Sequence, residues 1–327
     1  MFRALLLEKT DGKVTANLRQ LDDSALPDFP VTAKVSYSTL NYKDGLAIAD
    51  KGKIVREFPL IPGIDWAGTV ETSDDDRFKA GDRVILTGWG VGEQFHGGMA
   101  ERARAKAEWL IKMPPGMDKK WAMSMGTAGL TAMLAVHALE ANGLKKDREV
   151  LVTGAAGGVG SVAVAILAKL GHKVVAATGR LELESYLKAL GAASVMDRAE
   201  LAKPAKPLEG ERWAGVIDTV GGPALANALA SMAYRAPVAA CGLAGSHDLP
   251  TTVMPFILRG VKLIGIDSVR CPIPERDAAW RKLAALLPDG LPVGGTKIVG
   301  LSDVPALAEQ IVAGQIQGRI VIDVSQA

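Results

Sequence analysis

Two patterns of apolar residues divide the chain. In the first third, short runs that alternate or are wholly apolar predict strands, because successive side chains of a strand point to opposite faces. Glycine, proline and aspartate separate these runs, which is typical of a small β-rich domain. The predicted strands cover residues 2–7, 31–37, 68–70, 83–86 and 109–112, and one helix covers residues 41–49.

The pattern changes after Pro115. Alanine, methionine and leucine recur at helical spacing over residues 119–140. Beyond residue 149, apolar strands alternate with helices, which indicates a parallel sheet covered on both faces. The predicted strands are residues 150–153, 173–177, 194–196, 215–218, 237–240 and 263–266, and the predicted helices are residues 161–170 and 182–190.

The last segment returns to a mixed pattern. It predicts helices at residues 275–287 and 304–313 and strands at residues 297–299 and 318–324. The simplest arrangement is an α/β fold. A doubly wound parallel-sheet domain of residues 123–267 is inserted into a β-rich domain made of residues 1–122 and 268–327.

A glycine-rich turn follows the strand predicted at residues 150–153 and leads into a helix. Glycine allows a positive φ and lets backbone N–H groups come close to phosphate oxygens. The start of the helix adds unpaired donors and a partial positive charge. Residues Gly154, Gly157, Gly158 and Gly160 therefore predict a site for a dinucleotide diphosphate. Ala155 departs from the common glycine spacing, and a tight turn with no ligand is the alternative.

The tip of the next predicted strand indicates which dinucleotide binds. An acidic residue there is typical of NAD(H) sites, whereas this chain has Thr178, Gly179 and Arg180. An arginine forms charge-assisted hydrogen bonds with a 2′-phosphate, and Arg198, after the third strand, can add a second charge. The sequence therefore predicts NADP(H), with solvated surface charges as the alternative for both arginines.

Composition narrows the class of protein. The formal net charge of the 327-residue chain is +2 and aromatic residues make up 5%, which argues against nucleic-acid partners. Two cysteines cannot build a disulfide framework or a four-thiolate zinc site. The N-terminus lacks the features of a signal peptide, and the apolar run at residues 159–170 is too short to span a bilayer. We expect a cytoplasmic protein with no membrane partner.

The chain resembles the medium-chain dehydrogenase/reductase superfamily over essentially its whole length. The motifs are STLNYKD at residues 38–44, IPGIDWAG at 61–68, GDRV at 81–84 and GTAGLTA at 126–132. A narrower similarity, to the NADPH-dependent acrylyl-CoA reductases, rests on TGWGVGE at 87–93, CGLAG at 241–245, LPTTVMPFILR at 249–259 and QIQGR at 315–319.

This resemblance implies a GroES-like domain, a Rossmann domain and an active site between them. It also implies NADPH as hydride donor, acryloyl-CoA as substrate, propanoyl-CoA as product, and a homodimer that pairs through the last Rossmann strand. The implied cofactor contacts are Tyr42, Ala156, Gly157, Gly158, Val159, Thr178, Gly179, Arg180, Arg198, Leu243, Ile257 and Ser268.

Zinc enzymes of this superfamily place a cysteine and a histidine where this chain has Asn41 and Ile64. Isoleucine cannot bind a metal and asparagine is a poor zinc ligand. Residues 92–112, where the family's structural cysteines would lie, contain no cysteine. We therefore expect no metal and place the chain in the zinc-free, quinone-reductase-like branch.

The chemistry expected without a metal is reduction of an activated alkene. The thioester carbonyl draws electrons from the β-carbon, where hydride adds, and the enolate must be stabilised and protonated. Tyr42 is the candidate donor of a hydrogen bond or proton, and Asn41 is the candidate to orient the carbonyl or the nicotinamide ribose. The alternative is that Tyr42 only packs on the cofactor and solvent supplies the proton.

Two other functions remain open from the sequence. One is an NADPH:quinone oxidoreductase, and the other is a non-catalytic NADPH-binding protein with a structural or redox-sensing role. The basic cluster of Lys51, Lys53 and Arg56 predicts a solvated loop, with contact to the nucleotide of coenzyme A as the alternative.

Overall fold

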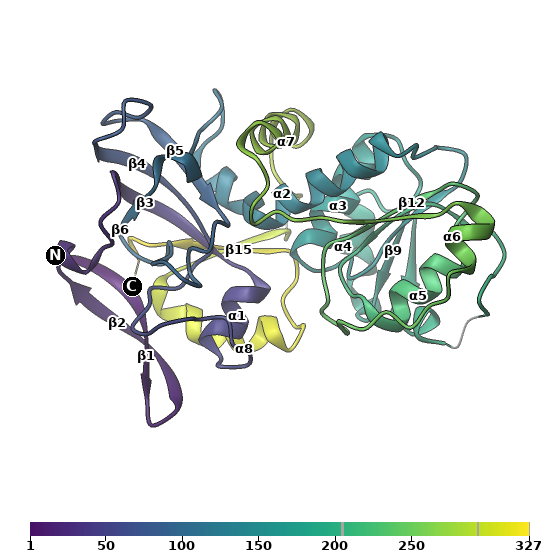
Figure 1. Cartoon of the computed structure of the whole chain (residues 1–327), viewed down its shortest axis with the longest axis horizontal. Coiled ribbons are helices and arrows are strands. Elements are labelled where there is room, and N and C mark those ends of the chain that lie inside the picture. Colours follow the sequence, from purple (N-terminus) through teal and green to yellow (C-terminus); the bar gives the residue numbers. More distant parts are fainter. Residues whose placement is uncertain (204–205, 293, 327) are drawn as a thin grey trace. The chain divides into compact units, whose positions relative to one another are not determined.

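A computed structural model describes residues 1–203, 206–292 and 294–326. It contains two compact units (Figure 1). Unit 1 combines Met1–Thr127, Val269–Arg281 and Thr296–Ala327, and unit 2 combines Ala128–Ser268 and Lys282–Gly295. The predicted fold class, a GroES-like β-rich domain plus a Rossmann domain, is confirmed. Residues 282–295, which the sequence had assigned to the β-rich part, group with unit 2.

The main sheet of unit 1 has the order β14-β15-β3-β4-β5-β7, and β6 also pairs with β3. Buried side chains such as Trp66, Leu86 and Ile322 form its core. The strands are β3 (Val31–Leu40), β4 (Asp65–Ser73), β5 (Arg83–Thr87), β6 (Arg102–Ala105), β7 (Ile111–Lys112), β14 (Thr296–Val299) and β15 (Arg319–Asp323). Strand β15 lies between β14 and β3, so the sheet needs residues from both ends of the sequence.

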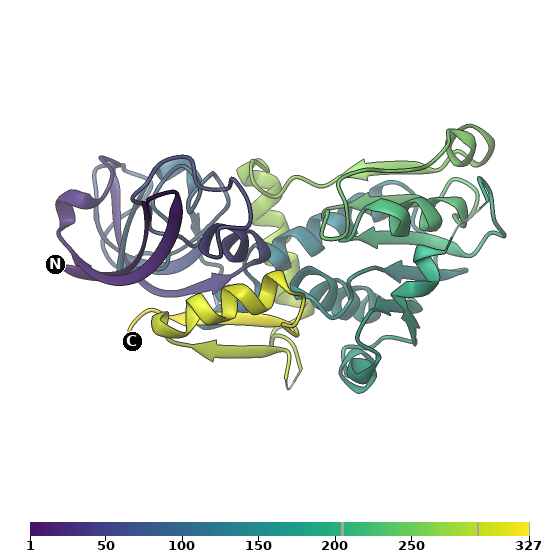
Figure 2. The same ribbon diagram turned by 90° about the horizontal axis from the view of Figure 1, so that it is seen from below.

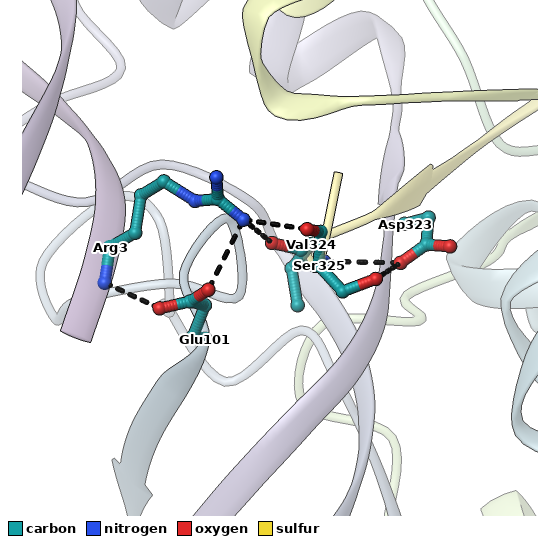
Figure 3. Close-up of polar contacts among 5 residues, drawn as sticks. All are labelled: Arg3, Glu101, Asp323, Val324 and Ser325. Atoms are coloured by element: carbon teal, nitrogen blue, oxygen red, sulfur yellow. Dashed lines mark hydrogen bonds and ion pairs between the residues drawn. The ribbon is translucent and has the colours of Figure 1, made fainter. Parts of the chain in front are cut away.

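A separate hairpin of β1 (Phe2–Thr10) and β2 (Lys13–Leu21) packs beside this sheet. Arg3 fastens it to residues that follow β15 (Figure 3). The Arg3 guanidinium donates to the carbonyl oxygens of Ser325, at 2.7 Å, and Val324, at 3.3 Å, and forms an ion pair with Glu101 at 3.2 Å. Segments far apart in the sequence are thus joined by one side chain.

Helix α1 (Tyr42–Ile48) follows β3 and packs against α8 (Val304–Val312). Helix α8 is the yellow helix near the C-terminus in Figure 2. Gly45 permits this close packing, because a Cβ there would collide with Ile311 and lie 3.2 Å from the carbonyl oxygen of Ala308. Helix α8 therefore supports the helix that begins at Tyr42. Helix α7 (Ile273–Leu286) contributes its first turns to unit 1.

Unit 2 contains a wholly parallel sheet with the order β10-β9-β8-β11-β12-β13. Numbered along the chain, this is the order 3-2-1-4-5-6 of a Rossmann domain. The strands are β8 (Glu149–Val152), β9 (Val174–Thr178), β10 (Ser194–Asp197), β11 (Trp213–Asp218), β12 (Pro237–Ala240) and β13 (Lys262–Gly265). The helices are α3 (Gly158–Lys169), α4 (Glu184–Ala189), α5 (Gly222–Ala230) and α6 (Met254–Arg259).

Helix α2 (Lys119–Ala141) is interrupted at Gly126, whose φ of 52° and ψ of −154° are not helical. By length and composition it is the one helix in the described ranges that could cross a membrane, but most of its apolar window is buried inside the protein. Five short 3-10 helices complete the described elements: η1 (Asp23–Ala25), η2 (Ala107–Trp109), η3 (Leu181–Leu183), η4 (Arg198–Ala202) and η5 (Leu301–Asp303).

Candidate functional site

The glycine-rich turn of unit 2 runs from the end of β8 to the start of α3 and covers residues 153–157. It is called the phosphate turn below. Gly154 has a φ of 60°, and a Cβ there would collide with the hydroxyl of Thr219. A Cβ on Gly160 would collide with the Gly154 carbonyl and lie 2.7 Å from the Cα of Ala155. The turn therefore needs glycine at both positions, and the N–H groups at the start of α3 remain available to bind an anion.

Neighbouring strands hold the turn in place. The backbone N–H of Ala155 donates to the carbonyl of Ala177 at 3.0 Å, and the Thr153 hydroxyl donates to Asp218 at 2.7 Å. Asp218 is fully buried, and burial raises the pKa of its carboxyl above the usual range. These contacts fix the backbone that would surround a diphosphate.

The residues at the tip of β9 come together with Arg198. Arg198 packs on the backbone of Gly179, since a Cβ on that glycine would lie 2.8 Å from the Cζ atom of Arg198. The Arg180 guanidinium donates to the carbonyl of Ala156 in the phosphate turn at 3.4 Å. Burial, and the nearby charge of Arg198, lower the pKa of Arg180. Two guanidinium groups beside the Thr178 tip form a fitting site for a phosphate monoester.

Three other predicted contacts have different surroundings. Ser268 is buried and its hydroxyl accepts a hydrogen bond from Thr131 at 2.8 Å. Leu243 lies in the exposed loop after β12. Ile257 lies on α6, just before the first residue of β13, whereas the phosphate turn follows the last residue of β8. In this parallel sheet those are opposite ends of the strands, so unit 2 does not bring Ile257 to the turn.

In unit 1, Asn41 immediately precedes α1 and Tyr42 is its first residue. Tyr42 is 38% exposed, and among the described residues none forms a hydrogen bond with its hydroxyl. Asn41 is buried, and its amide nitrogen donates to the hydroxyl of Thr39 at 2.8 Å and to Asp65 at 2.9 Å. The Tyr42 side chain is therefore accessible, and the Asn41 side chain is fixed by hydrogen bonds to residues of β3 and β4.

A buried polar network lies behind these two residues. Asp44 accepts hydrogen bonds from the backbone of Asn41 at 2.8 Å and of Ile64 at 2.9 Å. Burial raises the pKa of Asp44 to about 7, and the charge of Asp65 adds to this effect. Asp65 also accepts from the backbone N–H of Thr127 at 2.8 Å and from the Thr127 hydroxyl. The sequence had identified Asp65 only as part of a family motif, and gave no sign that it joins three segments.

Cys241 follows β12 and is a further titratable residue near the glycine-rich turn. Cys241 donates a hydrogen bond to the carbonyl of Asp218 at 3.3 Å, and burial raises the pKa of its thiol to about 12. A thiol in this state is a poor nucleophile. Over the ranges 1–203, 206–292 and 294–326, no three His, Cys, Asp or Glu side chains are grouped so that they could hold a metal ion.

Known protein families match both units. A family model described as an alcohol dehydrogenase GroES-like domain matches residues 28–115, and one described as a zinc-binding dehydrogenase matches residues 158–287. The chain is 56% identical to the probable acrylyl-CoA reductase AcuI of Escherichia coli strain K12, over 99% of this chain and 100% of that protein. This chain belongs to the medium-chain dehydrogenase/reductase superfamily. The resemblance to acrylyl-CoA reductases of the AcuI type that the sequence indicates is confirmed.

Further members of this superfamily are similar over their full length. The acrylyl-CoA reductase AcuI of Ruegeria pomeroyi is 53% identical, over 99% of this chain and 100% of that protein. The yhdH oxidoreductase of Salmonella enterica in complex with NADP has a TM-score of 0.95 and 52% identity, covering 98% of this chain and 99% of that chain. The Bacillus subtilis protein yhfP, solved with NAD bound, has a TM-score of 0.94 and 45% identity, covering 99% of each chain.

Proposed function

We propose that this protein reduces the 2,3 double bond of acryloyl-CoA with NADPH and forms propanoyl-CoA. The observation that carries the proposal is full-length similarity to acrylyl-CoA reductases, at 56% and 53% identity. The quinone-reductase function receives weaker support. The accessible Tyr42 and the complete glycine-rich turn favour an enzyme over a non-catalytic NADPH-binding protein.

The residues of unit 2 fit NADPH. The N–H groups at the start of α3 suit the diphosphate, and Gly154 and Gly160 leave room for the backbone to approach it. Arg180 and Arg198 at the tip of β9 suit the 2′-phosphate that distinguishes NADPH from NADH. A relative solved with NADP supports this preference. Because another relative was solved with NAD bound, NADPH and NADH are compared in the assay below.

When bound, NADPH supplies the hydride that adds to the β-carbon of the thioester, and a proton completes the reduction at the α-carbon. Tyr42 is proposed to donate a hydrogen bond to the thioester oxygen as negative charge develops there, because its hydroxyl is accessible. Asn41 is proposed as a positioning residue. Its amide hydrogens are taken up by Thr39 and the neighbouring carboxylates, so it orients the first turn of α1.

We propose that the reaction needs no zinc. Asn41 and Ile64 occupy the positions at which zinc enzymes of the superfamily have ligands, and an isoleucine side chain has no atom that can bind a metal while asparagine is a poor zinc ligand. Dialysis against a zinc chelator should leave the rate of NADPH oxidation unchanged. A loss of activity restored by added zinc would contradict this.

The deciding experiment follows NADPH oxidation with acryloyl-CoA, crotonyl-CoA and a simple quinone in parallel, with NADH as the control donor. We expect the highest kcat/KM with acryloyl-CoA and NADPH. A higher kcat/KM with the quinone would support the quinone oxidoreductase, and no turnover with any acceptor would support a binding protein. The Tyr42→Phe variant in the same assay removes only the hydroxyl, so an unchanged kcat would reduce the role of Tyr42 to packing.

We also propose a cytoplasmic homodimer. Strand β13 lies at the edge of its sheet, and Leu263 on it is 36% exposed. An exposed apolar edge strand is suited to pairing with a second copy across a two-fold axis. A sequence with two cysteines fits a reducing compartment. A light-scattering mass equal to one chain would overturn the dimer.

A further inference from the structure

A cavity of about 400 Å³ opens in unit 1, outside the polar network of Asp44 and Asp65. Aromatic and charged side chains dominate its lining, together with the glycine-rich loop that follows β5. The lining residues that matter here are Trp89, Glu93, Phe95, Lys106, Trp109 and Arg270. None of these residues takes part in the mechanism proposed above.

Buried Arg276 holds the walls of this cavity in place. Its guanidinium donates to the carbonyl of Thr87 at 2.8 Å and to the carbonyl of Val269 at 3.2 Å. It also lies 5.1 Å from the centre of the Trp89 ring, while the Trp89 backbone donates to Val269 at 3.0 Å. Two of the three chain segments that line the cavity, residues 89–95 and 269–270, are thus tied to each other before any ligand binds.

The charges in the cavity favour an anion. The Lys106 ammonium lies over the rings of Trp109 and Phe29, 5.2 and 5.6 Å from their centres, and no carboxylate of the described residues forms an ion pair with it. Arg270 adds a second cation and is exposed. The single acid, Glu93, is balanced by Lys43 at 2.9 Å. A net positive charge beside aromatic faces suits a phosphorylated ring compound.

The cavity is linked to the proposed reaction centre through one ion pair. Lys43 directly follows Tyr42 in the first turn of α1, and its partner Glu93 lies in the cavity wall. A ligand with its reactive group at Tyr42 and a long flexible arm would therefore reach the cavity with its other end. Coenzyme A thioesters have this form: an acyl group, a pantetheine arm and a phosphorylated adenine nucleotide.

We propose that this cavity binds the phosphorylated nucleotide of the coenzyme A thioester, an inference that rests on the acyl-CoA substrate proposed above. The adenine ring would stack on the aromatic wall of Trp89 and Phe95. Lys106 and Arg270 would bind the phosphates. The exposed cluster of Lys51, Lys53 and Arg56, considered for this role from the sequence, does not line this cavity.

The test compares acryloyl-CoA with the acryloyl thioester of N-acetylcysteamine, which has the same reactive group and lacks the nucleotide. Lys106→Met should raise the KM for acryloyl-CoA roughly tenfold, because a charge-assisted hydrogen bond is lost. The kinetic constants for the truncated thioester should not change. Lys112→Met is the matched control, since Lys112 also lies over an aromatic ring, that of Phe78 at 5.5 Å, but outside the cavity.

Arg270→Gln provides a second variant, and titration calorimetry with free coenzyme A provides a second measurement. An equal change for both thioesters in both variants would overturn the site while leaving the reaction intact. If the wild-type protein does not reduce acryloyl-CoA, the reaction fails instead. The site would then survive only if coenzyme A binds and Lys106→Met weakens that binding, and absence of binding would overturn it too.

Discussion

At the scale of single residues, the protein places like charges together in two locations. Arg180 and Arg198 share the tip of β9, and Asp44 and Asp65 share the buried network behind α1. Both arrangements raise the free energy of the protein unless a partner compensates. For the carboxylates the partners are hydrogen-bond donors of the chain. For Arg180 the charge of Glu182 opposes the effect of Arg198, and the proposed 2′-phosphate would add to that compensation.

Arg180→Ala should weaken NADPH binding by roughly 10- to 100-fold, because it removes a charge-assisted bond to the 2′-phosphate. NADH lacks that phosphate and should bind almost as it does to the wild type. Fluorescence titration of both dinucleotides measures the ratio. An equal loss for NADPH and NADH would contradict the assignment of the 2′-phosphate to Arg180.

Asp44 should make the protein less stable as the pH rises. Its pKa is about 7 in the folded state against 3.8 in the reference state, so the folded protein holds a proton that the unfolded chain has released. The contribution is complete near pH 4 and is lost as the pH passes 7, by about 4 kcal/mol in total. Asp44→Asn should flatten this part of the curve of unfolding free energy against pH.

The exposed Asp76 provides the control for that experiment. Asp76→Asn should leave the slope of the wild-type curve in place between pH 4 and 8. Parallel curves for the wild type and Asp44→Asn would mean that Asp44 is ionised in the folded protein throughout this range.

The sequence predicted where residues lie when one short segment determines their position. Thr178, Gly179 and Arg180 lie at the end of β9 and directly after it, so their proximity needs no knowledge of the rest of the chain. Asp65 could not be found in this way, because its partners Thr39 and Thr127 come from other segments. Neither could the stacking of Arg276 on Trp89, which are nearly two hundred residues apart.

At the scale of elements, the phosphate turn and α3 show how geometry restricts the sequence. Gly160 is the third residue of α3, where its missing Cβ lets the helix approach the turn before it. Apolar strands and glycine turns of this kind were predictable because one short segment contains all their determinants. The predicted strand at residues 237–240 coincides with β12 for the same reason.

Gly160→Ala should abolish NADPH binding or weaken it by more than tenfold, because the added methyl group displaces the Gly154 carbonyl and with it the N–H groups that face the diphosphate. Calorimetric titration with NADPH measures the loss. Gly210→Ala is the control, since a Cβ there meets nothing within 4 Å. Unchanged affinity in Gly160→Ala would show that the turn adapts.

Three elements that are exposed, short or begin with turn-forming residues were not predicted from the sequence pattern. Strand β2 is mostly half-buried or exposed, so its alternation is weak. Helix α5 begins with glycine and proline, which indicate a turn in isolation, and α6 is only one and a half turns long. Tertiary packing, more than the local sequence, determines that these three elements form.

At the scale of the whole molecule, unit 1 depends on contacts between distant parts of the sequence. Strand β15 pairs with β3, and Arg3 bonds to the residues just after β15. Arg3→Met should lower the free energy of unfolding by about 1 kcal/mol, because a partly exposed charge-assisted cluster is lost. Thermal or urea unfolding monitored by circular dichroism measures the change.

Arg19→Met is the matched control on the same hairpin. Arg19 also forms an ion pair, with Glu8 at 2.8 Å, but its side chain is 49% exposed and the pair should contribute little to stability. Equal effects of the two substitutions would show that Arg3 stabilises no more than a surface ion pair.

The position of β15 inside its sheet has a consequence for synthesis on the ribosome. By the time residue 295 is made, every segment of unit 2 exists, whereas β3 of unit 1 has β4 and β6 but still lacks β15. At roughly 5–20 residues per second, on the order of tens of seconds separate the two strands. During that interval the nascent chain carries an open strand edge, which is a site for aggregation or chaperone capture. Unit 1, whose translation begins first, is therefore the last unit to be completed.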